Sequence, residues 1–330
     1  MPDRNSCGII LGDAHMNMRI GPIVKGSLTY IPGVKRVFLK RDTGGTNSAK
    51  YCYDVWLKHL TMLWESGMHS IPNSLAELGP GDSMGIGLAA MLSGVDTYYA
   101  LDVVKYSNTN FNIRILNELI TLFHERASGP AEGWPNCDQY LDENHFPSHI
   151  LTEDELRISL SEERVSRIRN AIMEPESSNR GIAVNYVAPW SDESVIDKET
   201  VDVIISHAVL EHVVDLKGAY RALYTWLKPG GMMSNQIDFS SHGLSEKWNG
   251  FRAYPEWVWK LIVGKRSFLI NRQPHSVHID LMERNEFKII CDLKHYRKEG
   301  GIQRSQLSSH WKGISDDDLA ISSAFIQAQK

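Results

Sequence analysis

The stretch that decides the fold is Leu75–Asp102, which reads LAELGPGDSMGIGLAAMLSGVDTYYALD. Its first apolar run ends in an acid, Glu77, and a tight Gly-Pro-Gly turn follows with glycines at Gly79 and Gly81. Small residues after the turn begin a helix, and a second apolar run ends in another acid, Asp102. Strand, glycine turn, helix, strand and acid in this order predict the first half of a nucleotide-binding α/β domain.

Each part of this stretch has a physical role. Glycine lets the backbone turn sharply and lets a ligand approach it, and a helix N-terminus presents unpaired N–H groups. A carboxylate at the tip of the second strand can accept two hydrogen bonds from a ribose diol. The third glycine of a G-x-G-x-x-G dinucleotide fingerprint is replaced by Met84, whose side chain would crowd a pyrophosphate. The sequence therefore disfavours NAD.

A second block lies about 120 residues further along the chain. Residues 201–206 (VDVIIS) are β-branched and apolar, which predicts a buried strand. The sequence continues as HAVLEHV, with Glu211 and His212, into a predicted helix at 216–227. Lys228-Pro-Gly-Gly then ends that helix and begins another strand.

The two blocks together resemble the class I S-adenosylmethionine-dependent methyltransferases. Acid-x-Gly-x-Gly at Glu77–Gly81 is similar to their motif I, and VLEHV…LKPGG is similar to their passage from the fourth to the fifth strand. The resemblance implies that the glycine turn lies against the methionine part of S-adenosylmethionine and that Asp102 holds the ribose hydroxyls. It covers residues 75 to 329, although residues 126–180 are not explained by the core family.

Longer segments resemble a bacterial subfamily met in surface-polysaccharide and O-antigen biosynthesis loci. These segments are GTNSAKYCYDVWLKHL, ELGPGDSMGIGLAAMLSG, ALDVV, IDFSSH and NRQPHSVHIDLMERNEF. This resemblance implies an acceptor that is a sugar or a glycan intermediate.

The predicted fold is of the α/β class, a Rossmann-like, seven-stranded and mostly parallel sheet with strand order 3-2-1-4-5-7-6. The predicted strands lie at residues 75–78, 97–101, 182–187, 201–206, 231–237, 287–292 and 321–328. The predicted core helices lie at residues 83–93, 109–126, 216–227 and 276–285. Residues 1–70 are expected to form an N-terminal lid and helix, and residues 71–330 the methyltransferase domain. Two insertions are expected in that domain, a helical one at 127–181 and an acceptor-pocket one at 239–275. In the first insertion, residues 148–172 are predicted to be helical, with Thr152 or Ser161 as the N-cap.

Candidate cofactor contacts gather where the predicted strands end, the edge at which α/β sheets bind ligands. They are Glu77, Gly79, Gly81, Asp82, Ser83, Asp102, Val103, Pro189, Trp190, Ser206 and His207. Asp82 and Ser83 are also candidate helix caps. Trp190 is expected either to stack on the adenine ring or to lie in the core.

Methyl transfer needs a base only when the acceptor must lose a proton. Asp238 and His242 leave the fifth predicted strand together, and a carboxylate–imidazole pair there could take a hydroxyl proton. His212 is a second candidate base, with a structural role as the alternative. Metal-assisted methylation of a sugar diol is a further alternative, but no dense ligand motif supports it, so no metal is expected.

The candidate substrate residues are Trp248, Arg272 and His278. The insertion is rich in aromatic residues, and Arg272 could hold a phosphate or carboxylate of the acceptor or form a helix-flanking salt bridge. At the other end of the chain, the loop 43–46 with Tyr51 and Tyr53 could close over the cofactor.

Composition narrows the class of protein. The chain has 330 residues and a net charge of −5, and its basic residues are scattered, which argues against nucleic acid as a partner. No apolar run approaches the ~20 residues that span a bilayer, so no integral membrane segment is expected. The four cysteines lack metal-ligand spacing, and the N-terminus lacks the pattern of a signal peptide. These features favour a cytoplasmic protein with a small-molecule or glycan acceptor, and none indicates an oligomeric state.

The sequence thus favours a methyltransferase that uses S-adenosylmethionine to O-methylate a sugar or glycan intermediate. One rival has the same fold and methylates a lipid, quinone or amine acceptor. A second rival is a non-catalytic S-adenosylmethionine-binding protein, and a third is the NAD-dependent enzyme that Met84 disfavours.

Overall fold

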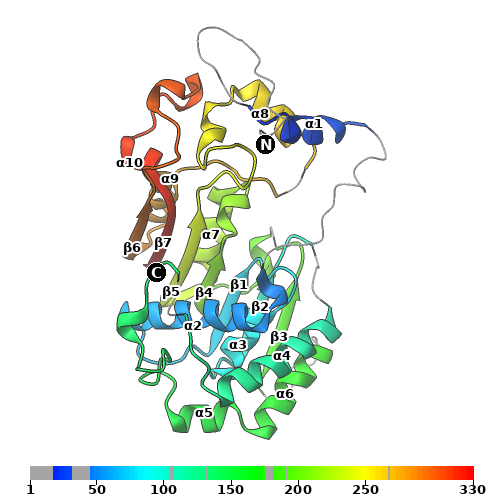
Figure 1. Ribbon diagram of the computed structural model, residues 1–330. Helices are drawn as coiled ribbons and strands as arrows, with labels where there is room; N and C mark the ends of the chain where they lie inside the picture. Colours follow the sequence, from blue (N-terminus) through cyan, green and yellow to red (C-terminus); the bar gives the residue numbers. More distant parts are fainter. Residues whose placement is uncertain are drawn as a thin grey trace, which may run out of the picture.

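The computed structural model describes residues 18–31, 45–104, 108–130, 133–174, 181–190, 192–266 and 268–330. Its seven strands form one sheet in the order β3-β2-β1-β4-β5-β7-β6, which confirms the predicted fold (Figure 1). Strand β7 is antiparallel to both of its neighbours, and the other pairs are parallel. The strands are β1 (Ser74–Leu78), β2 (Thr97–Leu101), β3 (Ala183–Val187), β4 (Val201–His207), β5 (Leu227–Asp238), β6 (Lys288–Tyr296) and β7 (Ile321–Gln329).

Helices cover both faces of the sheet, which explains why its strands are apolar on both sides. Leu75 and Val203 point into the core beneath the first helices, whereas Ala76 and Ile204 point into the opposite core. The first face carries α2 (Ala49–Glu65), α3 (Gly85–Leu92), α4 (Thr109–His124), α5 (Glu153–Ser159) and α6 (Glu162–Met173). The second face carries α7 (Leu216–Trp226) and α9 (His275–Arg284), and the short α10 (Asp316–Ala320) precedes β7.

A smaller body, here called the cap and made of residues 18–31 and 239–274, has its own apolar cluster. Helices α1 (Ile20–Leu28) and α8 (Glu256–Val263) lie side by side in it (Figure 1). Their contact is close, because a Cβ atom built at Gly26 would lie 2.0 Å from the carbonyl oxygen of Leu261. Since residue 239 follows β5 directly, the cap stands at the carboxyl ends of the central strands.

The predicted N-terminal lid is divided between two parts of the molecule. Helix α1 belongs to the cap, whereas α2 is a core helix in which Tyr53, Trp56 and Leu60 are fully buried. The predicted lid loop begins at residue 43, and its first two residues lie outside the described residues, as do residues 1–17.

The helical insertion forms two helices where the sequence analysis expected one continuous helix from 148 to 172. Both candidate caps are used: Thr152 caps α5 in a capping box with Glu155, and Ser161 caps α6. The second cap starts a new helix and so explains the break. Within the described ranges, no helix combines the length and the apolar character needed to cross a membrane.

Candidate functional site

The glycine turn after β1 requires glycine at two positions. The φ angles of Gly79 and Gly81 are +66° and +73°, in the left-handed region that other residues rarely adopt. A Cβ atom at Gly79 would also lie 2.6 Å from Cγ2 of Val209. The turn is held to β2 by the N–H of Gly79, which donates to the carbonyl of Leu101 at 2.8 Å. The backbone therefore presents itself bare at this edge, as a cofactor in close contact would need.

Helix α3 begins at Gly85, two residues later than predicted, and Met84 takes the N-cap position without a side-chain hydrogen bond. The first N–H groups are nevertheless paired. That of Gly85 donates to Oγ of Ser83 at 3.1 Å, and that of Met84 donates to Oδ1 of Asn112 at 3.0 Å. The chain itself thus satisfies these helix donors and fixes the turn.

The N-terminal segment also contacts this turn through Thr46. Its Oγ1 accepts from the main-chain N–H groups of Asp82 at 2.9 Å and of Ser83 at 3.3 Å. The hydroxyl of Ser83 in turn donates to the carbonyl of Thr46. The described end of the predicted lid loop is therefore bonded to the glycine turn.

Glu77 holds the turn from behind. Its side chain is 2 % exposed and accepts from the N–H of Gly87 at 3.2 Å and from the hydroxyl of Tyr98. Burial raises the pKa of Glu77 to about 7, against the lowering effect of these two hydrogen bonds. The residue is thus built into the core, where it positions the helix that follows the turn.

Asp102 lies at the tip of β2, beside the glycine turn. Its carboxylate accepts from the N–H of Val103 at 2.7 Å and from the hydroxyl of Tyr186 at 3.4 Å. Burial raises its pKa, while hydrogen bonds from the main chain of Val103, Val104 and Gly81 act in the opposite direction. Val103 itself is 39 % exposed, an apolar surface next to the carboxylate.

Of the two positions expected for the ring of Trp190, against adenine or in the core, the structure shows the core position. The ring is buried in the core, with its centroid 6.2 Å from that of Trp226. The main chain of Trp190, which follows Pro189, donates to the carbonyl of Asp102 at 3.1 Å. The segment 189–190 therefore borders the tip of β2 with its backbone.

Ser206 and His207 end β4, and their side chains are engaged inside the protein. Oγ of Ser206 donates to Oδ1 of Asn235 at 2.8 Å, and Nδ1 of His207 lies 3.3 Å from Nε2 of His59. Burial lowers the pKa of His207 to about 3, so its ring is neutral. His59, on the buried face of α2, also contacts Ser234 at 2.8 Å. His59 was not predicted as a site residue. The only sequence signal for it is its position on the apolar face of a predicted helix.

Asp238 and His242 do meet at the end of β5. Nε2 of His242 lies 3.2 Å from Oδ2 of Asp238, and the N–H of Ser240 donates to Oδ1 at 2.7 Å. Burial raises the pKa of Asp238, but the partners His242 and Ser240 outweigh it and hold that pKa below its usual value. The ring of His212 lies 5.0 Å from that of His242, and burial lowers its pKa to about 4.

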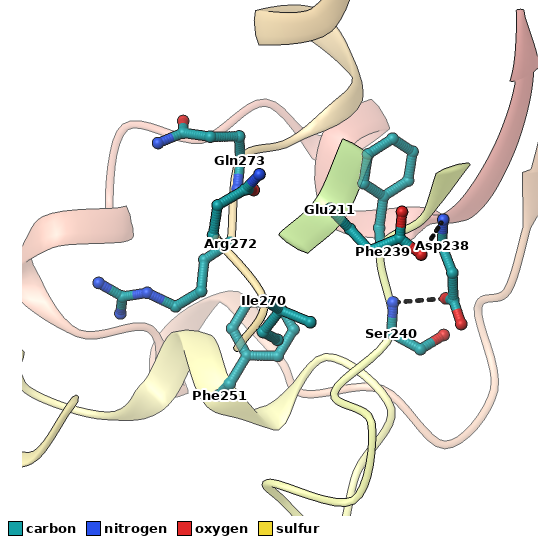
Figure 2. A pocket seen from close by; sticks show the side chains of 9 residues that line it. Glu211, Asp238, Phe239, Ser240, Phe251, Ile270, Arg272 and Gln273 are labelled. Atoms are coloured by element: carbon teal, nitrogen blue, oxygen red, sulfur yellow. Dashed lines mark hydrogen bonds between the residues drawn. The ribbon is translucent and has the colours of Figure 1, made fainter. Parts of the chain in front are cut away.

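Glu211 lies with these residues at the carboxyl ends of β4 and β5, here called the mouth, and was not among the predicted site residues. Figure 2 shows its carboxylate beside Asp238 in a pocket that Ser240 and Arg272 also line. Its side chain is 2 % exposed, and Oε1 accepts from the N–H of Asp238 at 3.3 Å. Burial, reinforced by the nearby charge of Asp238, raises the pKa of Glu211 to about 8. Its neighbour His212 was predicted as a candidate base instead, because imidazole titrates near neutral pH.

Of the three candidate substrate residues, Arg272 lines the pocket. It forms an ion pair with Glu256 at 2.9 Å, and its guanidinium carbon lies 4.3 Å from the ring centroid of Trp259. Trp248 is 6 % exposed and is not among the residues that line this pocket. His278 is fully buried, and its Nδ1 contacts the hydroxyl of Tyr220 at 2.8 Å. The structure therefore places His278 in the core, which corrects its expected place on the acceptor wall.

A second arginine, Arg252, lies close to Arg272 and carried no signal in the sequence. Their guanidinium carbons lie 5.4 and 5.5 Å from the ring centroid of Trp311. Arg252 is fully buried and donates to the carbonyl of Asp318 at 2.9 Å. Within the described chain, Nε and Nη2 of Arg252 and Nε and Nη1 of Arg272 have no hydrogen-bond partner.

Residues 150–234 match a family model described as a methyltransferase domain. No curated protein matches the chain by sequence.

Among solved structures, an S-adenosylmethionine-dependent methyltransferase from Mesorhizobium loti shares 12 % identity at a TM-score of 0.40, over 82 % of this chain and 96 % of that one. Phosphoethanolamine N-methyltransferase 2 from Haemonchus contortus, in complex with S-adenosyl-L-methionine, shares 14 % identity at a TM-score of 0.43, over 89 % of this chain and 59 % of that one. Both TM-scores lie below 0.5, so neither structure carries an argument about this chain.

Proposed function

We propose that this S-adenosylmethionine-dependent methyltransferase acts on a hydroxyl group of a sugar or glycan intermediate. The observation that carries the proposal is the contact of His242 with Asp238 at the carboxyl end of β5. Transfer of a methyl group to a hydroxyl releases a proton, so a positioned base is useful there. An amine acceptor that is already neutral would leave this pair without a task.

The cofactor end fits S-adenosylmethionine, which supplies a methyl group on a sulfonium when bound. Asp102 would accept the ribose hydroxyls, because its carboxylate sits at the strand tip beside the bare backbone of Gly79 and Gly81. The exposed Val103 offers an apolar surface for the adenine ring, and the backbone of Pro189 and Trp190 borders the same strand tip. The methionine part would then lie along residues 77–83, with Ser206 and His207 closing the floor.

At the acceptor end, His242 would take the hydroxyl proton. Asp238 would orient the imidazole through the 3.2 Å contact. His212, with its lowered pKa, stays neutral beside it and shapes the mouth. The pair would thus convert the hydroxyl into a better nucleophile at the moment of transfer.

The acceptor is proposed to carry a negative group, a phosphate or a carboxylate. Arg272 and Arg252 are buried guanidinium groups whose remaining nitrogens find no acceptor within the part of the chain that the structure describes. Buried donors without acceptors are costly, and an anionic ligand would supply the acceptors they lack.

A reducing, cytoplasmic location belongs to the same proposal. Cys52 and Cys137 are buried free thiols, and Cys291 is a free thiol as well. The protein would then bind phosphate-bearing intermediates of glycan assembly, the acceptor class proposed above, in solution. No nucleic acid is proposed as a partner.

The test is tritiated methyl transfer from S-adenosylmethionine to a panel of nucleotide sugars and sugar phosphates. We expect His242→Ala to lower kcat by roughly 10²- to 10⁴-fold, the usual contribution of a positioned base. Affinity for S-adenosylhomocysteine should stay within about twofold, because His242 lies at the other end of the site. His69→Ala, at an exposed position outside the cap, is the matched control. Near wild-type turnover of His242→Ala across the pH range would instead favour an acceptor that needs no base.

A further inference from the structure

Three potential metal ligands converge at the mouth formed by β4 and β5. Glu211, His212 and His242 each offer one ligand atom, and these three atoms all lie within 4.8 Å of one another. Glu211 and His212 come from the single turn Leu210–His212 after β4, and His242 comes from the loop after β5. Loops from two neighbouring strands therefore build the cluster, and no long side chain has to reach into it from outside.

Two of these side chains lack the partners that burial normally demands. In the described residues, Oε2 of Glu211 and Nδ1 of His212 are buried and have no hydrogen-bond partner. Glu211 is 2 % exposed, so its free oxygen is shut off from water. A buried carboxylate oxygen without a partner is costly, and a ligand or an ion that interacts with it would offset that cost.

The charges around the cluster favour a cation. Asp238 brings a second carboxylate, since its Oδ2 lies 3.2 Å from His242 and its N–H bonds Glu211. The arginine that lines the pocket, Arg272, pairs with Glu256, and Figure 2 shows its guanidinium pointing away from Glu211. Among the described ion pairs, none joins Glu211 or Asp238 to a lysine or arginine.

We propose that Glu211, His212 and His242 bind a divalent first-row transition-metal ion, with Zn²⁺ as the reference ion. Two imidazoles and one carboxylate suit Zn²⁺ and its neighbours, whereas Mg²⁺ and Ca²⁺ favour sites made wholly of oxygen. Asp238 then orients His242 from behind, the usual arrangement of a carboxylate beside a metal-bound histidine. Three protein ligands leave a further position open for an oxygen of the acceptor or for water.

The existence of this site does not depend on the acceptor, but its use in catalysis rests on the proposed function. With the ion bound, His242 is a ligand and not a base. Coordination at the open position would lower the pKa of the acceptor hydroxyl, whose proton would pass to solvent water as the methyl group is transferred to the oxygen. His242 is therefore a ligand in the metal-bound form and a base in the metal-free form. Metal binding is measured separately from turnover for this reason.

The experiment titrates the full chain, freed of metal with a chelator, with Zn²⁺ in a calorimeter and with Co²⁺ in a visible absorption spectrometer. We expect one site for Zn²⁺, Co²⁺ bands typical of four-coordination, and binding of Mg²⁺ weaker by at least roughly 10-fold. Glu211→Gln, His212→Ala and His242→Ala should each weaken Zn²⁺ binding by roughly 10-fold or more, since each removes a ligand. His69→Ala should leave it unchanged.

Circular dichroism and affinity for S-adenosylhomocysteine verify that each variant is folded. Glu211→Gln keeps an oxygen for the N–H of Asp238, so it tests the ligand with little change in shape. Absence of Zn²⁺ binding to folded protein, or binding that all three variants retain, overturns the metal proposal. Turnover that persists in chelator then leaves the proposed function intact, whereas bound metal without any sugar methylation refutes the function alone.

Discussion

At the glycine turn the buried polar groups are paired within the chain, whereas at the mouth of β4 and β5 several of them are not. Glu77 and the first N–H groups of α3 have partners from the protein itself. At the mouth and in the cap, the described residues leave Glu211, His212, Arg252 and Arg272 with buried atoms that have no partner. The two regions thus differ in how far the chain itself satisfies their buried polar groups.

The difference indicates which end is preorganised. A turn whose hydrogen bonds are complete keeps its shape when the ligand leaves, so binding there costs little ordering. Unpaired buried groups cost stability, and they are best explained by a ligand that supplies the missing partners. The glycine turn is therefore fixed by the chain itself, whereas the buried groups at the mouth of β4 and β5 await partners from outside the described chain.

The largest expected effect breaks the cofactor end. Asp102→Ala removes the two proposed hydrogen bonds that the ribose hydroxyls donate to the charged carboxylate, each worth about 1.5–3 kcal/mol. Calorimetry with S-adenosylhomocysteine should show affinity weakened by roughly 10²-fold or more. Asp238→Ala, at the other end, should change that affinity by less than about threefold. Equal losses in the two variants would contradict the assignment of Asp102 to the ribose.

A smaller effect concerns how the cofactor end responds to pH. The pKa of Glu77 is raised from its usual 4.5 to about 7, so between these values the folded protein holds a proton that the unfolded chain has lost. Stability from this group is complete below pH 4.5 and falls as the pH rises through 7.

Glu77→Gln keeps an oxygen for Gly87 and Tyr98 but cannot ionise. The free energy of unfolding, measured with urea without ligand, should therefore fall less steeply between pH 5 and pH 8 than in the wild type. The exposed Glu143→Gln is the control and should follow the wild type. A parallel pH profile for Glu77→Gln would mean that the carboxylate is already ionised in the fold.

The smallest expected change in stability is at the acceptor end. Arg252→Met replaces a buried guanidinium with an apolar side chain of similar length. Two nitrogens of that guanidinium have no hydrogen-bond partner among the described residues. The free energy of unfolding should change by less than about 1 kcal/mol, because the desolvation cost disappears together with the hydrogen bond to Asp318.

The same variant should raise KM for an anionic acceptor by roughly 10-fold or more, the value of a charged hydrogen bond. Arg252→Ala, which leaves a cavity, should destabilise the fold by about 2 kcal/mol or more and serves as the comparison. If Arg252→Met loses more than about 3 kcal/mol, Arg252 is a structural residue and the contrast between the two ends weakens.

The fold was predictable because its signals are local and repeated. Apolar runs such as residues 201–206 and turns such as Gly79–Gly81 mark strands and their ends wherever they occur. The strand order came from the family resemblance, and the structure confirms it. The break at Ser161 was missed because one helical period continues across it, even though the cap residue itself had been noted.

The site was predictable only where a residue's position in the sequence determines which way its side chain points. Asp238 and His242 are four residues apart on one loop, so their meeting follows from the chain. Trp190 and His278 turned inward because Trp226 and Tyr220 offered partners from elements distant in sequence. Arg252 and His59 gave no signal for the same reason, since their neighbours are assembled only by the folded sheet and cap.

The contact between α1 and α8 also sets an order of assembly. The N–H of Lys265 donates to Oγ1 of Thr29 across 236 positions of the chain, and Gly26 lies against the end of α8. During synthesis the first helix therefore leaves the ribosome long before the surface on which it docks exists. Until residue 265 has been made, the face of α1 that packs against α8 stays uncovered, so the cap is completed only late in synthesis.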